Sequence, residues 1–175
     1  MVGKMSKTID TVEELLAHVQ VMEREACECY LDLAEQMDMH NNPEVAALFT
    51  RLAADEKEHL AYVEKLIGKA EIPHIAPWNL KNFGDSGIDV TGTHYVHYMM
   101  TPYHALKLAR RAERNTVSFF VGVIETSNNQ EVRHMAAEFE QEEQRHIEQI
   151  EQWLNKVARP DEDWDDDPDP PVQPT

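Results

Sequence analysis

The chain has 175 residues, 42% of them hydrophobic, and a formal net charge of −17. This length suits a single domain with a hydrophobic core, and no apolar run reaches the roughly 20 residues that a membrane-spanning helix needs. The acidic balance argues against nucleic acid as a partner, because phosphate binding needs a basic surface. The N-terminal residues lack the apolar stretch of a signal peptide, so we expect a cytoplasmic protein.

The first half of the sequence predicts two long amphipathic helices that follow a flexible N-terminus, residues 1–10. The first helix begins near Thr11, which has the spacing of a capping box with Glu14. Its apolar residues recur at alternating steps of four and three, which indicates packing in a bundle. A turn at residues 40–43 leads into the second helix, which Gly68 ends.

A long connection separates these helices from a second pair. Residues 69–101 contain several prolines and glycines, so we predict a crossover of about 33 residues with only short helical turns. The His, Tyr and Met residues clustered at 94–100 are interpreted as packing contacts of this crossover rather than as a site. The third helix begins at Thr101, and the fourth runs to about Ala158. The acidic, proline-rich residues 160–175 are predicted to be disordered.

Two Glu-x-x-His motifs interrupt the apolar faces of the second and fourth helices. They are Glu56 with His59 and Glu143 with His146, and one offset of 87 residues relates both members of the pairs. Residues three apart lie on one face of a helix, so the carboxylate and the imidazole of each motif can reach one point. The motifs therefore predict an internal duplication of a helical hairpin.

Glu23 and Glu113 lie beside the core faces of the first and third helices, and an offset of 90 residues relates them. The helical rise puts them roughly 23–27 Å from the turns that end their helices, close to the depth of Glu56 and Glu143. A carboxylate so near a core needs a partner or a metal ion. Because the four lie at nearly one level, we expect them to meet inside the bundle.

One glutamate from each of two helices and a Glu-x-x-His motif from each of the other two predict a carboxylate-bridged two-metal site. Four buried carboxylates cannot all stay ionised without cations, and their charges balance two divalent ions. Oxygen-rich ligands with one nitrogen suit iron or manganese better than structural zinc, so we expect two iron ions, with manganese or a mixed pair as the alternative. Glu56 and Glu143 are the expected bridges. The predicted ligands are Glu23, Glu56, His59, Glu113, Glu143 and His146.

Three further residues lie close to the predicted ligands along the sequence. Asp55 and Glu142 precede the motif glutamates and lie four residues before the motif histidines. They are candidates to accept the second N–H of a ligand histidine, and solvated surface charges are the alternative interpretation. Tyr30 is a candidate to hydrogen-bond near the metals or to take part in redox chemistry, with a core tyrosine as the alternative.

The order and spacing of these residues resemble the ferritin-like superfamily and, within it, the rubrerythrin-like group. The residues that carry the resemblance are Glu23-x-x-Ala26-x-x-x-Tyr30, Glu56-x-x-His59, Glu113 and Glu143-x-x-His146. The resemblance implies an all-α domain over residues 11–159, an antiparallel four-helix bundle with a long crossover between helices 2 and 3, often as a homodimer. It also implies non-haem di-iron redox chemistry, commonly peroxide reduction.

This sequence differs from rubrerythrins proper in two respects. They carry a rubredoxin domain that delivers electrons, whereas the cysteines here are Cys27 and Cys29 alone, which excludes a rubredoxin-type site in this sequence. They also usually carry an extra carboxylate one turn before the ligand of helix 3, where this sequence has Arg110. Arg110 is expected either to pair with a ligand carboxylate or to face outwards.

These observations leave three hypotheses of function. The first is a di-iron oxidoreductase that reduces hydrogen peroxide or O2 with electrons from an external donor. The second is ferroxidase activity with iron storage or delivery, which the acidic balance fits. The third is a non-catalytic bundle that a metal stabilises and whose acidic tail binds a partner.

Overall fold

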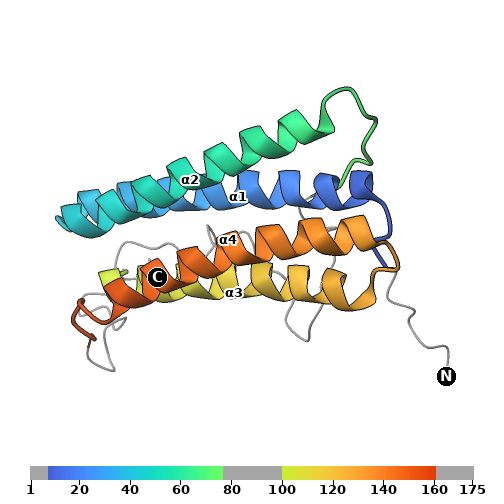
Figure 1. Cartoon of the computed structure of the whole chain (residues 1–175). Coiled ribbons are helices and arrows are strands. Elements are labelled where there is room, and N and C mark those ends of the chain that lie inside the picture. Colours follow the sequence, from blue (N-terminus) through green and yellow to red (C-terminus); the bar gives the residue numbers. More distant parts are fainter. Residues whose placement is uncertain (1–7, 77–99, 161–175) are drawn as a thin grey trace, which may run out of the picture.

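Four long α-helices make up most of the computed structural model, which describes residues 8–76 and 100–160 (Figure 1). They are α1 (Val12–Met39), α2 (Pro43–Ile67), α3 (Pro102–Thr126) and α4 (Gln130–Leu154). Side chains cap three of the four N-termini: the Thr11 hydroxyl accepts from the Glu14 N–H at 3.2 Å, and Thr101 and Asn129 do the same for α3 and α4. Such caps satisfy backbone N–H groups that have no partner inside the helix.

The helices form two hairpins, α1 with α2 and α3 with α4, that pack side by side (Figure 1). Each hairpin is antiparallel, and α2 ends at the opposite end of the bundle from the start of α3, as a crossover connection requires. The predicted all-α, antiparallel four-helix bundle is therefore confirmed. Most of the predicted crossover, residues 77–99, lies outside the described residues, together with most of the cluster at 94–100. Met100, its last member, is buried.

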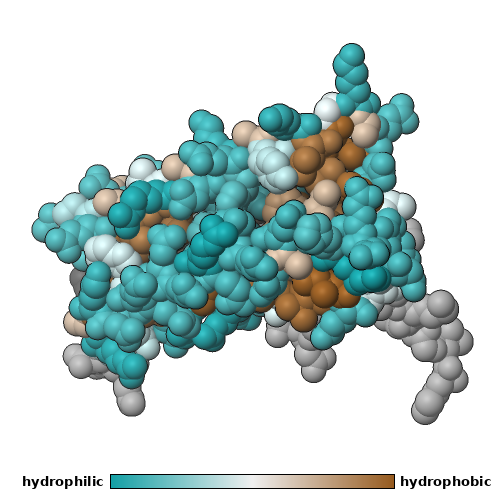
Figure 2. Space-filling view, in the orientation of Figure 1, coloured by the Kyte–Doolittle hydropathy of each residue, from teal (hydrophilic) through white to brown (hydrophobic). Residues whose placement is uncertain are grey.

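The hydrophobic core consists of two clusters of buried side chains. One contains Phe49, Leu106 and Ile150, and the other contains Leu15 and Phe119. Along each helix, the polar residues of the predicted metal site lie between the stretches that contribute to the two clusters. Hydrophilic side chains cover most of the face seen in Figure 2. No helix in the described part of the chain is long and apolar enough to cross a bilayer.

The two ends of the bundle differ from the sequence-based boundaries. Residues 8–10, grouped above with a flexible N-terminus, belong to the fold: Ile9 is fully buried, and the Asp10 carboxylate accepts from the Asn128 N–H at 2.7 Å. The last helix ends at Leu154, before the predicted Ala158. A tighter turn follows, in which the Lys156 N–H donates to the carbonyl of Trp153, three residues back, at 2.9 Å.

Candidate metal centre

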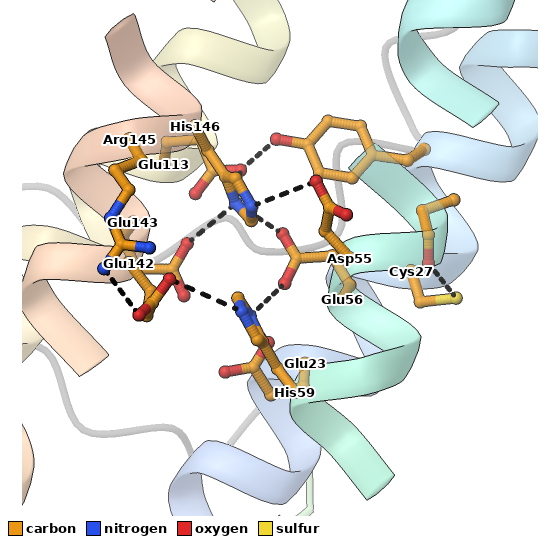
Figure 3. A network of polar contacts seen from close by, with 12 residues as sticks. Glu23, Cys27, Asp55, Glu56, His59, Glu113, Glu142, Glu143, Arg145 and His146 are labelled. Carbon is orange, nitrogen blue, oxygen red and sulfur yellow. Dashed lines mark hydrogen bonds and ion pairs between the residues drawn. The ribbon is translucent and has the colours of Figure 1, made fainter. Parts of the chain in front are cut away.

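Six side chains from all four helices converge at the middle of the bundle (Figure 3). Their ligand atoms fall into two groups of four, and within each group these atoms all lie within 4.8 Å of one another. The first group is Glu23, Glu56, His59 and Glu143, and the second is Glu56, Glu113, Glu143 and His146. Glu56 and Glu143 belong to both groups. All six residues that the sequence analysis singled out are thus brought together, and the two expected bridges lie where the groups overlap.

The centre is almost closed to solvent. None of the four glutamate residues exceeds 3% exposure, and His146 is 3% exposed. The side chain of His59 is 20% exposed and marks the side on which the centre approaches the surface. Carboxylates buried to this degree need cations or donors around them.

Glu56 lies between the two histidines. Its Oε1 is 3.0 Å from His146 Nδ1, and its Oε2 is 3.4 Å from His59 Nδ1. The two imidazole rings stack with their centroids 5.6 Å apart. Among the residues that the structure describes, none of these four buried atoms has a hydrogen-bond partner. Unpartnered oxygens and nitrogens that face one another are what a pair of oxygen- and nitrogen-preferring metal ions requires, so the residues fit the expected cofactor.

Without metal, the surroundings of several side chains at the centre favour their protonated forms. Burial and the nearby Glu56 carboxylate raise the pKa of Glu23 and Glu143 well above that of an ordinary glutamate. Contacts with Glu23 and Glu56 raise the pKa of His59 to about 10. Burial opposes a charge on His146, but contacts with the surrounding glutamates outweigh it and raise that pKa as well. Metal ligands must be deprotonated, so metal binding has to displace these protons.

Tyr30 makes the two groups unequal. Its hydroxyl donates a hydrogen bond to Glu113 Oε1. Burial and the carboxylates of Glu113 and Glu56 raise its pKa well above the usual value, so the phenol stays protonated and able to donate. The corresponding residue of the second hairpin is Phe120, which is buried and has no hydroxyl. Hydrogen bonding at the centre, one of the two roles expected of Tyr30, is therefore present in the structure.

Asp55 and Glu142 face the histidines of the opposite hairpin. His146 Nε2 is 3.9 Å from Asp55 Oδ2, and His59 Nε2 is 3.9 Å from Glu142 Oε2. These distances are those of an ion pair and exceed a hydrogen bond. Each carboxylate lies four residues before the motif histidine of its own helix, but it approaches the histidine of the other hairpin, so the contacts cross between α2 and α4. Glu142 is also held by Arg145, whose Nη2 lies 2.7 Å from Glu142 Oε1.

Arg110, the residue at which this sequence departs from rubrerythrins proper, turns away from the centre. Its Nη1 is 3.8 Å from Glu151 Oε1, and its side chain is 28% exposed. The second of the two expectations for Arg110, an outward-facing side chain, is therefore confirmed.

The comparisons with known proteins agree with this architecture. A profile of the Rubrerythrin family matches residues 14–154. Among solved structures, the chain is similar to a crystal structure of an uncharacterized conserved protein from Magnetospirillum magnetotacticum, with a TM-score of 0.74 and 31% sequence identity. The match covers 86% of this chain and 98% of that one. No curated protein matches. The family match includes all six converging residues, and the chain therefore belongs to the rubrerythrin family.

Proposed function

We propose that the chain is a non-haem di-iron redox protein that reduces hydrogen peroxide or O2 with electrons from an external donor. The observation that carries this proposal is the pair of four-residue groups that share Glu56 and Glu143. A single structural ion needs only one such group, whereas shared carboxylates suit two ions held close together.

The residues have distinct roles in this proposal. Glu56 and Glu143 would each contact both metal positions, with Glu23 and His59 completing one position and Glu113 and His146 the other. When two iron ions are bound, they supply the two electrons that one H2O2 and two protons consume in forming two molecules of water. Tyr30 keeps the proton of its hydroxyl, which donates a hydrogen bond to Glu113. Its ring is buried away from solvent.

A small oxidant fits the access that the protein provides. The partly exposed His59 lies beside Glu142, between α2 and α4, whereas His146 is buried. Because His59 is the most exposed of the six predicted ligands, molecules as small as H2O2 and O2 are expected to reach the centre on its side. A bulky organic substrate would need the helices to separate.

The test is rapid anaerobic mixing of the iron-loaded, reduced full chain with peroxide. We expect peroxide to re-oxidise the iron of the unchanged protein on the time scale of rapid mixing. Re-oxidation should be at least about tenfold slower in Glu113→Ala, because that variant loses a carboxylate of one group. Glu125→Ala, at an exposed position on the same helix, is the matched control. Equal rates for the unchanged protein and Glu113→Ala would rule out peroxide reduction at this centre.

Iron oxidation is a second candidate that one observation favours. The side chains of Asp55 and Glu142 are 47% and 37% exposed, and both lie near the histidines of the centre. Carboxylates there can attract Fe(II) from solution. Adding Fe(II) in excess under O2 separates the two candidates. A ferroxidase oxidises many Fe(II) ions per chain, whereas a peroxide reductase oxidises only the two ions that its centre holds.

The crossed contacts make a specific prediction. Asp55→Asn is expected to change the imidazole 15N signals of His146 and leave those of His59 unchanged, and Glu142→Gln is expected to do the reverse. Affinity for metal should fall by about 10–100-fold, as for other residues that orient a ligand. The effect of Glu142→Gln should be the smaller, because Arg145 already engages that carboxylate. Shifts confined to the histidine of the same helix would contradict the crossed arrangement.

A further inference from the structure

Basic side chains gather at the end of the bundle where α3 begins and α4 ends. A pocket of about 210 Å³ lies among them, and Glu151 is the only acidic residue among the described residues that line it. The lining is Tyr103, Lys107, Arg110, Glu151, Leu154, Asn155 and Arg159, and we call it the basic pocket. This excess of positive charge contrasts with a chain whose formal net charge is −17.

Glu151 cannot neutralise the basic pocket alone. Its Oε1 already lies 3.0 Å from Arg114 Nη2 and 3.8 Å from Arg110 Nη1. The other two cations flank an aromatic ring: Lys107 Nζ is 5.6 Å and Arg159 Cζ is 5.9 Å from the centroid of Tyr103. Both side chains are exposed, and cation–π contacts with Tyr103 leave their charge available to an anion. The basic pocket therefore presents positive charges to an anion.

A second, more apolar pocket adjoins the same segment. It has a volume of about 730 Å³, and Arg159 and Pro160 line it together with Trp153, Val157 and Pro43. Arg159 thus belongs to both pockets. An occupant that suits the pair combines several carboxylates with a large apolar side chain.

The chain itself supplies such an occupant directly after Pro160. Residues 161–169 contain seven acids, no Lys or Arg, and one aromatic residue, Trp164. Fully extended, these nine residues reach up to roughly 30 Å, which is enough to return to pockets that Arg159 lines. We propose that the acidic segment 161–169 docks on the basic pocket of its own chain, with Trp164 in the adjoining apolar pocket.

Covalent linkage is the reason to favour this occupant over an acidic partner protein. A segment attached two residues from Arg159 is present at a high effective concentration, so weak and solvent-exposed ion pairs suffice to hold it. Because such ion pairs are screened, docking is expected to weaken as the salt concentration rises.

The test measures the order of the segment's backbone in the full chain by {1H}–15N heteronuclear NOE of residues 161–169. We expect these values to fall by at least about half in Lys107→Glu/Arg159→Glu, and likewise for the unchanged protein in about 0.5 M NaCl. The matched control is Arg51→Glu/Lys65→Glu, which makes the same change of charge at exposed positions on α2 and should leave the NOE values unchanged.

A charge swap completes the test. Adding Asp165→Lys/Asp166→Lys/Asp167→Lys to Lys107→Glu/Arg159→Glu is expected to restore the NOE values. The proposal is overturned if the unchanged segment is as disordered as in Lys107→Glu/Arg159→Glu, if the α2 control loses order equally, or if the charge swap restores nothing. It is also overturned if the order depends on protein concentration, because the occupant would then be the segment of a second copy.

Discussion

Glu56→Gln is expected to abolish binding of a metal pair. Glu56 belongs to both four-residue groups, and its two oxygens face different histidines, so the uncharged amide weakens both metal positions at once. Loss of a partner that merely orients a ligand costs about 10–100-fold in affinity, and we expect a loss of more than about 100-fold here. Anaerobic titration with Fe(II), followed by metal analysis after desalting, measures the change.

Two further variants make this expectation specific. Glu58→Gln changes an exposed glutamate two residues away on the same helix and should bind metal like the unchanged protein. Glu23→Gln removes a carboxylate from one group only, so it should spare the other metal position. A Glu56→Gln protein that still holds two ions tightly would show that Glu56 does not bridge.

The stability of the metal-free protein is expected to fall as pH rises from about 6 to 9. His59 and His146 have pKa values raised above 6.5 in the folded state, so the stability that they contribute is complete below that value and is lost as pH rises toward the folded pKa, about 10 for His59. Glu23 and Glu143, with raised pKa values, act in the same direction above 4.5. We expect the melting temperature to drop on the order of 10 °C.

Metal binding should reverse this trend. Bound ions take the place of the protons, so the increase in melting temperature on loading should grow with pH. Calorimetry at several pH values, with and without metal, measures both slopes. The His59→Gln/His146→Gln variant should show a flatter metal-free profile. A metal-free melting temperature that rises between pH 6 and 9 would contradict the assigned proton positions.

The six converging residues could be predicted from sequence because helical geometry is regular. A fixed rise for each residue turns sequence distance into depth, so the residue numbers alone match Glu23 and Glu113 with the two Glu-x-x-His motifs. The duplication supports the match by repeating the pattern at offsets of 87 residues for the two motifs and 90 residues for Glu23 and Glu113. That these residues bind metal stays a prediction, which the fit of their unpartnered atoms supports.

The crossing of Asp55 and Glu142 is harder to predict. Spacing along one helix says which residues share a face, and it says nothing about which side chain of a neighbouring helix lies closer. The duplication could have indicated the crossing, because α2 and α4 are equivalent helices from two hairpins. If Asp55 of α2 lies near His146 of α4, the equivalent Glu142 of α4 is expected near His59 of α2. The burial of Ile9 escapes prediction for another reason: a single apolar residue before a helix has no periodicity to mark it as buried.

The division of the core into two clusters has a consequence for how the domain melts. All four helices run through both clusters, so neither cluster can open alone without breaking helices at the level of the carboxylates. The four helices therefore couple the two core clusters at the level of the buried carboxylates. Ions bound there would strengthen this coupling. We expect the domain to unfold in one cooperative transition whose midpoint temperature rises with the metal occupancy of the centre.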